Sequence, residues 1–124
     1  MSTQDADKPV EIRERAFAFA VRVIRLCQHL DESPGGSRTI SKQLLRAGTS
    51  IGANLEEARA GQSRPDFINK NAIALKEARE TLYWIRLLTA ADLLSESRVA
   101  ELRSEAEELT RIVAAIIVSA KKSS

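Results

Sequence analysis

The sequence predicts an all-α fold, an antiparallel up-down-up-down four-helix bundle. Three observations lead to it: three breaks divide the chain into four stretches, every stretch repeats apolar residues at helical spacing, and the connections are short. The 124 residues suit one domain that spans residues 1–124. We expect helices at residues 8–31, 39–60, 64–90 and 96–121, with residues 1–7 and 122–124 flexible.

Each break is recognised by its turn chemistry. Residues 31–37 contain a Pro-Gly-Gly tripeptide, which cannot continue a helix. Residues 61–66 begin with a glycine suited to a helix end, and Ser63 then starts a capping box that has aspartate three residues later. Residues 90–95 form a weaker break, with Ser95 as the expected N-cap of the last helix.

The apolar residues of each stretch recur at alternating steps of three and four, which is a heptad seam and not a strand pattern. These seams are Ile12, Ala16, Phe19, Val23, Leu26 and Leu30; Ile40, Leu44, Ala47, Ile51, Asn54 and Ala58; Ile68, Asn71, Leu75, Ala78, Leu82 and Ile85; and Val99, Leu102, Ala106, Leu109, Val113, Ile116 and Ala120.

Two seam positions are polar, Asn54 and Asn71. In one interpretation these amides pair with each other or with the backbone and fix the register of the second and third helices. In the other they line a polar pocket between those helices. Glu57, one turn from Asn54, would contribute to either arrangement.

Several apolar residues fall outside the seams, although a bundle helix needs only one buried stripe. On the third helix these are Tyr83, Trp84 and Leu87, and on the fourth Ile117 stands beside the seam with Ile112 and Val118. Either the buried stripe of a single bundle is wide, or these residues form a subunit interface. We favour the interface.

Side chains suited to catalysis or metal binding are scarce. The chain has one histidine, His29, and one cysteine, Cys27, which lie two apart on a helix and point to different sides. A di-iron bundle needs two Glu-x-x-His motifs, so a single histidine excludes it. The spacing of Cys27 and His29 gives no zinc site and no Cys-His catalytic pair. We therefore expect no catalytic residues, no metal, no cofactor and no small-molecule substrate, so the protein is not expected to be an enzyme.

The composition fits a soluble cytoplasmic protein. It is 44% hydrophobic and 29% charged, with a net charge of +2. A single cysteine cannot form an internal disulfide, and we find neither a signal peptide nor an apolar run of about 20 residues that would span a membrane. We expect a cytoplasmic location and no membrane partner.

Charged residues on the second and third helices are open to two interpretations. Glu56, Glu57, Glu77 and Glu80 are interleaved with cations, which is typical of a solvated face. The less favoured interpretation is a polar network that fixes the conformation of the two helices.

Antiparallel topology brings a group of cations to one end of the bundle. This set, diluted by acidic residues, is Arg13, Arg15, Arg59, Arg64, Lys70, Lys121 and Lys122. Such a surface would bind phosphates without sequence preference and with strong salt dependence. No aromatic residue is interleaved with these cations, so base stacking is not supported.

Three segments resemble the signature of a bacterial family, the four helix bundle or 23S rRNA-intervening-sequence (S23) proteins. They are residues 46–58 (RAGTSIGANLEEA), 63–68 (SRPDFI) and 74–84 (ALKEARETLYW). The resemblance covers roughly residues 38–120 and implies a left-handed bundle that assembles into a homopentamer. A related branch, the accessory variability protein of diversity-generating retroelements, partners a reverse transcriptase and nucleic acid.

The family supplies no catalytic residues. On the matched motif it implies structural or assembly roles for Ser50, Asn54, Glu57, Glu77 and Glu80. Two functions follow as hypotheses. One is an oligomer that binds RNA or a nucleoprotein through the basic residues Arg13, Arg59, Arg64, Lys70, Lys121 and Lys122. The other is a protein-interaction or scaffold module with no nucleic-acid role.

Overall fold

The computed structural model describes residues 3–32, 37–61 and 63–122, with side chains from residue 11 onward. Four helices and no strand are found in these ranges. The helices are α1 (Thr3–Asp31), α2 (Arg38–Arg59), α3 (Arg64–Ala90) and α4 (Glu96–Lys122). The all-α prediction with four helices is thus confirmed.

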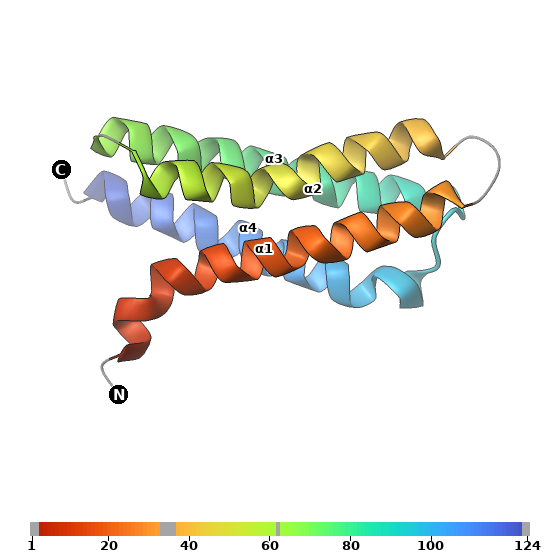
Figure 1. Cartoon of the computed structure of the whole chain (residues 1–124), viewed down its shortest axis with the longest axis horizontal. Coiled ribbons are helices and arrows are strands. Elements are labelled where there is room, and N and C mark those ends of the chain that lie inside the picture. Colours follow the sequence, from red (N-terminus) through yellow and green to blue (C-terminus); the bar gives the residue numbers. More distant parts are fainter. Residues whose placement is uncertain (1–2, 33–36, 62, 123–124) are drawn as a thin grey trace.

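Neighbouring helices run antiparallel, and both chain termini lie at the end of the bundle where α2 passes into α3 (Figure 1). Contacts run from α1 to α2, from α2 to α3 and from α3 to α4, and a sparser contact between α1 and α4 closes the bundle. Among the described residues the diagonal pairs, α1 with α3 and α2 with α4, have no Cα atoms within 8 Å of each other.

The sequence signals for the starts of α3 and α4 correspond to real caps. Ser63 has extended backbone, and its hydroxyl accepts a hydrogen bond of 3.2 Å from the Asp66 amide, while proline occupies the first turn. The Ser95 hydroxyl accepts from the Arg98 amide at 3.3 Å. The Pro-Gly-Gly tripeptide expected to separate α1 from α2 lies outside the described residues.

Helix α1 begins at Thr3, earlier than the expected residue 8. Residues 3–7 carry no apolar periodicity, so the seam pattern gave no sign of this first turn. The start of α1 bends away from α4 in Figure 1. At the other terminus Lys122 is still helical, and residues 123–124 lie outside the described part of the chain.

The seam expected on α1 is the one that is buried. All its members, from Ile12 to Leu30, are at most 8% exposed, and Phe19 and Val23 are completely buried. Cys27 joins this core, whereas His29 is exposed near the end of the helix. Burial of so much aliphatic surface is the main driving force for folding.

The seams of the other helices differ from the expected ones in register. On α3 the small Ala74 and Thr81 are fully buried, and the larger Leu75 and Leu82 are only half-buried at the side. α3 packs between two neighbours, so its axis-facing positions accept small residues while leucines fill the flanks.

Two further seam assignments, one on α2 and one on α4, need correction. On α2 the buried residue is Leu55, and Asn54 is half-buried. On α4 it is Ile117, at 9% exposure, and Ile116 is half-buried. In both helices the buried residues are separated by two successive steps of four, where a strict heptad would alternate three and four. An α-helix has 3.6 residues per turn, so a repeat of 3.5 residues gradually drifts off its buried face.

No helix in the described ranges is long and apolar enough to cross a membrane.

Candidate functional site

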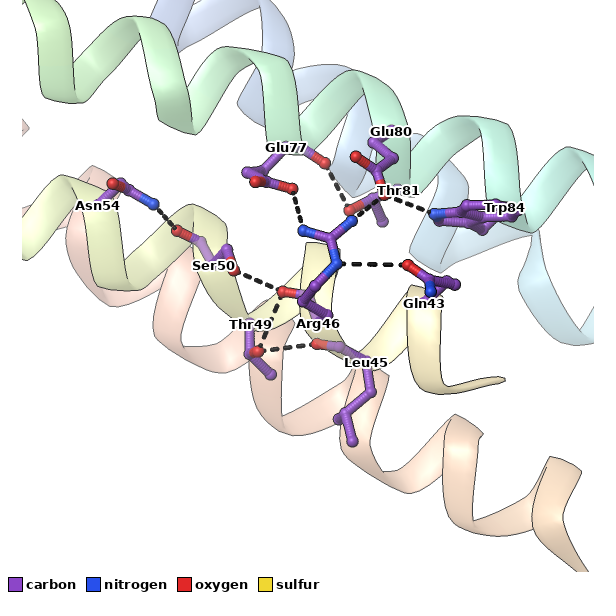
Figure 2. Close-up of polar contacts among 10 residues, drawn as sticks. All are labelled: Gln43, Leu45, Arg46, Thr49, Ser50, Asn54, Glu77, Glu80, Thr81 and Trp84. Carbon is purple, nitrogen blue, oxygen red and sulfur yellow. Dashed lines mark hydrogen bonds and ion pairs between the residues drawn. The ribbon is translucent and has the colours of Figure 1, made fainter. Parts of the chain in front are cut away.

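A polar network joins α2 to α3, with Arg46 at its centre (Figure 2). The Arg46 guanidinium donates to a carboxylate oxygen of Glu77 at 3.0 Å and to one of Glu80. Its Nε donates to the Gln43 amide oxygen at 3.4 Å. One arginine side chain on α2 thus holds two carboxylates that lie one turn apart on α3.

Trp84 extends the network along α3. Its indole Nε1 donates to Glu80 at 2.9 Å, and its ring meets Tyr83 edge-to-face at a centroid distance of 5.2 Å. Glu77 is 13% exposed and Glu80 27% exposed, so both carboxylates have lost much of their water and depend on these donors.

The polar residues expected to have structural roles bond either within their own helix or to another helix. Ser50, Asn54 and Asn71 bond to carbonyls four residues back on their own helices, at 2.6, 2.8 and 2.9 Å. The asparagines therefore bond to backbone, one of the options in the register interpretation. By contrast, Glu77 and Glu80 reach another helix, which is the network that the sequence analysis favoured less.

Three cations of the basic end are already paired with carboxylates. Arg13 pairs with Glu56 at 3.2 Å, and Lys70 lies 3.8 Å from Glu57, so both are partly neutralised. Arg15 makes two hydrogen bonds to Glu105, which raise its pKa, and so ties α1 to α4. These contacts reduce the positive field that the sequence predicted at this end.

Arg59 and Arg64 are the cations most available to a ligand. Arg59 closes α2 and Arg64 opens α3, so they flank one connection at the end that also holds both termini (Figure 1). Both are exposed, and neither forms an ion pair within the described residues. Lys121 and Lys122 are exposed in the last turn of α4 at the same end.

The expected interface residues on α3 and α4 are not equally accessible. Tyr83 is 53% exposed and Leu87 37% exposed, and together they form what we call the α3 patch. Trp84 is half-buried against the core. Ile117 belongs to the core itself, so its assignment to a surface interface is wrong for the register reason given above.

A second apolar surface was missed in the sequence. Phe17 is 71% exposed and Ile24 40% exposed, seven residues apart on one face of α1, and Leu45 on α2 is 37% exposed. Leu45 lies one turn from Gly48 on α2, and Gly48 closely approaches Val23 on α1. Leu45 therefore lies on the side of α2 that faces α1. We call Phe17, Ile24 and Leu45 the α1–α2 patch.

The remaining titratable side chains give little chemistry. Cys27 is buried, and burial raises the pKa of its thiol, which disfavours the reactive thiolate. Within the residues that the structure describes, no group of His, Cys, Asp and Glu side chains is arranged to hold a metal ion.

Fold and site together define an antiparallel four-helix bundle with an arginine-centred clamp between α2 and α3, one basic end and two exposed apolar patches. A model of the 23S rRNA-intervening sequence protein family matches residues 8–115. The chain therefore belongs to this family, and the resemblance seen in the sequence is confirmed.

A solved structure supports this assignment. The chain is similar to a protein of unknown function from the S23 ribosomal protein family of Bacteroides thetaiotaomicron VPI-5482, with 41% identity and a TM-score of 0.81. The match covers 86% of this chain and 97% of that one. No curated protein matches the sequence.

Proposed function

We propose that the protein is a non-catalytic, ring-shaped homo-oligomer that binds RNA or a nucleoprotein through its basic end. The proposal rests on two exposed arginines, Arg59 and Arg64. They flank the α2–α3 connection at the end of the bundle where α4 also ends. A ring would repeat these cations around its axis and raise the local positive potential.

Assembly is supported by the two apolar patches. The α1–α2 patch and the α3 patch are different surfaces, because α1 and α3 are diagonal in the bundle and have no Cα atoms within 8 Å of each other in the described residues. A contact between two different surfaces of identical chains is heterologous, and it generates a closed ring when the rotation between subunits closes. The pentamer implied by the sequence resemblance is the ring size we propose.

The basic end fits a backbone-binding role. Lys121 and Lys122 accompany the two arginines at this end, and the family is named after 23S rRNA-intervening sequences. Contacts of this kind position phosphates and read no bases, so affinity should fall steeply with salt.

A salt titration with a structured RNA tests this proposal. We expect binding at low salt that weakens linearly on a log–log plot. A double variant, Arg59→Glu with Arg64→Glu, should reduce the slope by about one unit per lost phosphate contact and abolish binding at physiological salt.

A matched control changes the same charge at the opposite end. Arg25 and Arg98 are exposed, and the variant Arg25→Glu with Arg98→Glu alters the net charge equally. It should bind RNA nearly as well as the wild type. Equal loss in both variants would mean a general charge effect, and no binding by the wild type at low salt would favour the protein-interaction module.

A further inference from the structure

A cavity of about 750 Å³ opens at the basic end of the bundle. All four helices line it, and its walls are mainly aliphatic, with Ile12 from α1, Leu55 from α2, and Ile112 and Ile116 from α4; Phe67 from α3 adds one ring. It lies at the end where α1 bends away from α4 in Figure 1. Its volume is within the range of small-molecule sites, roughly 300–1,000 Å³.

The charged side chains of this cavity are two cations and one anion, beside two neutral polar residues, Asn71 and Ser119. Arg13 and Arg59 line it, with Glu11 as the acidic residue among the lining side chains. Arg13 is 18% exposed and gives one guanidinium nitrogen to Glu56, but its Nε is buried and has no hydrogen-bond partner in the described structure. A buried, unpaired donor on a charged group is costly, so this position favours an acceptor.

The walls and the donors together select a ligand class. Aliphatic walls suit a hydrocarbon chain, and a charged N–H donor beside a second arginine suits a carboxylate. A nucleobase fits poorly, because it needs several polar partners and the walls are mainly aliphatic.

We propose that this cavity binds a medium-chain aliphatic carboxylate. The hydrocarbon chain lies among Ile12, Leu55, Ile112 and Ile116, and the carboxylate pairs with the guanidinium groups of Arg13 and Arg59, the Arg13 side chain turning so that its unpartnered Nε can donate. This site shares Arg59 with the phosphate-binding surface proposed above, but its test involves no RNA.

Calorimetric titration of the full chain with decanoate, kept below its micellar concentration, tests the proposal. We expect one decanoate per chain. Decyltrimethylammonium has the same chain with a cationic head, and acetate has the same head without the chain. Each should bind at least about tenfold more weakly: the cationic head cannot accept the charge-assisted hydrogen bond, and acetate lacks the hydrocarbon that the walls bury.

Two pairs of variants locate the site. Ala115→Phe fills the cavity from a position on its wall, whereas Ala100→Phe places the same ring on an exposed position of α4 outside it. Arg13→Met removes the donor, whereas Glu56→Gln removes only the ion partner of Arg13. Ala115→Phe and Arg13→Met should weaken decanoate binding about tenfold or more, and the two controls should not.

Several results would overturn the assignment. They are no decanoate binding by the wild type, equal binding of the cationic surfactant, or equal losses in a variant and its control. Circular dichroism at the titration temperature shows whether a variant is folded. If Ala115→Phe fails to fold, the comparison of Arg13→Met with Glu56→Gln decides alone.

Discussion

Helix α2 meets its two neighbours through opposite kinds of contact. Against α1 it presents Gly48 and Gly52, and a Cβ on Gly48 would lie 2.8 Å from a Val23 methyl group. Against α3 it presents Arg46, which reaches across to two carboxylates. The α1–α2 contact is steric and tolerates no added volume at Gly48, whereas the α2–α3 contact is a directional clamp whose strength depends on a single guanidinium.

The largest effect should come from adding volume to the steric contact. Gly48→Val should destabilise the fold by about 3 kcal/mol, because its side chain overlaps both Val23 methyl groups. Urea denaturation followed by circular dichroism measures this loss. Gly52→Ala is the control: its Cβ would sit 3.5 Å from the Ala16 Cβ, an ordinary contact, and the helix should gain about 0.5–1 kcal/mol. Equal behaviour of the two variants would contradict the steric account.

A smaller loss should follow from removing the clamp. Arg46→Met leaves Glu77 and Glu80 half-desolvated without their cation, and we expect a loss of about 1–2 kcal/mol after screening by solvent. Arg111→Met is the control, because Arg111 pairs with Glu108 on the surface of one helix and should change stability by less than about 0.5 kcal/mol. If both variants lose the same stability, the clamp has no special role.

The indole of Trp84 should contribute less still. Trp84→Phe keeps most of the ring but removes the hydrogen bond to Glu80, which is worth about 0.5–1.5 kcal/mol. Thermal denaturation of the wild type and the variant measures the difference. In an Arg46→Met background the loss should change, because both donors share Glu80; strictly additive losses would show that the two are independent.

The smallest effect near neutral pH should come from Cys27, whose Sγ lies 3.4 Å from the Ser41 carbonyl oxygen in the α1–α2 contact. Burial raises the pKa of this thiol, so the folded state keeps its proton longer than the unfolded state. Stability should be unaffected at about pH 7 and should fall as pH rises above about 8.5, the unfolded-state pKa. Urea denaturation at the two pH values, compared with Cys27→Ala, measures the difference. A variant with the same pH dependence as the wild type would contradict this assignment.

The buried seam of a helix could be predicted from the sequence where its spacing was unambiguous, whereas specific polar pairs between helices could not. The α1 seam was predicted completely, because its members keep alternating steps of four and three residues from Ile12 to Leu30. On α3 both Ala74 and the neighbouring Leu75 fit such a pattern, so the two could not be ranked from the sequence. A polar network between the second and third helices was the less favoured interpretation, but Arg46 could not be assigned to it. Arg46 is 31 and 34 residues from its partners, and heptad spacing carries no information about pairs between helices.

Part of the α1–α2 patch could have been predicted from the sequence. Phe17 and Ile24 are seven residues apart and outside the seam, the same argument that singled out Tyr83 and Leu87 on α3. Leu45 could be added only after the close approach of Gly48 to Val23 had placed α2 beside α1.

Light scattering of mixed variants tests the proposed ring most directly. The wild type should have a molar mass of about five times the 13.7 kDa of one chain. Phe17→Glu and Tyr83→Glu should each remain monomeric, because each lacks one of the two patches. Mixed in equal amounts, each chain still offers the patch that the other needs, so the mass should rise to that of a dimer. A wild type that stays monomeric at micromolar concentration, or a mixture that stays monomeric, would contradict assembly through two different patches.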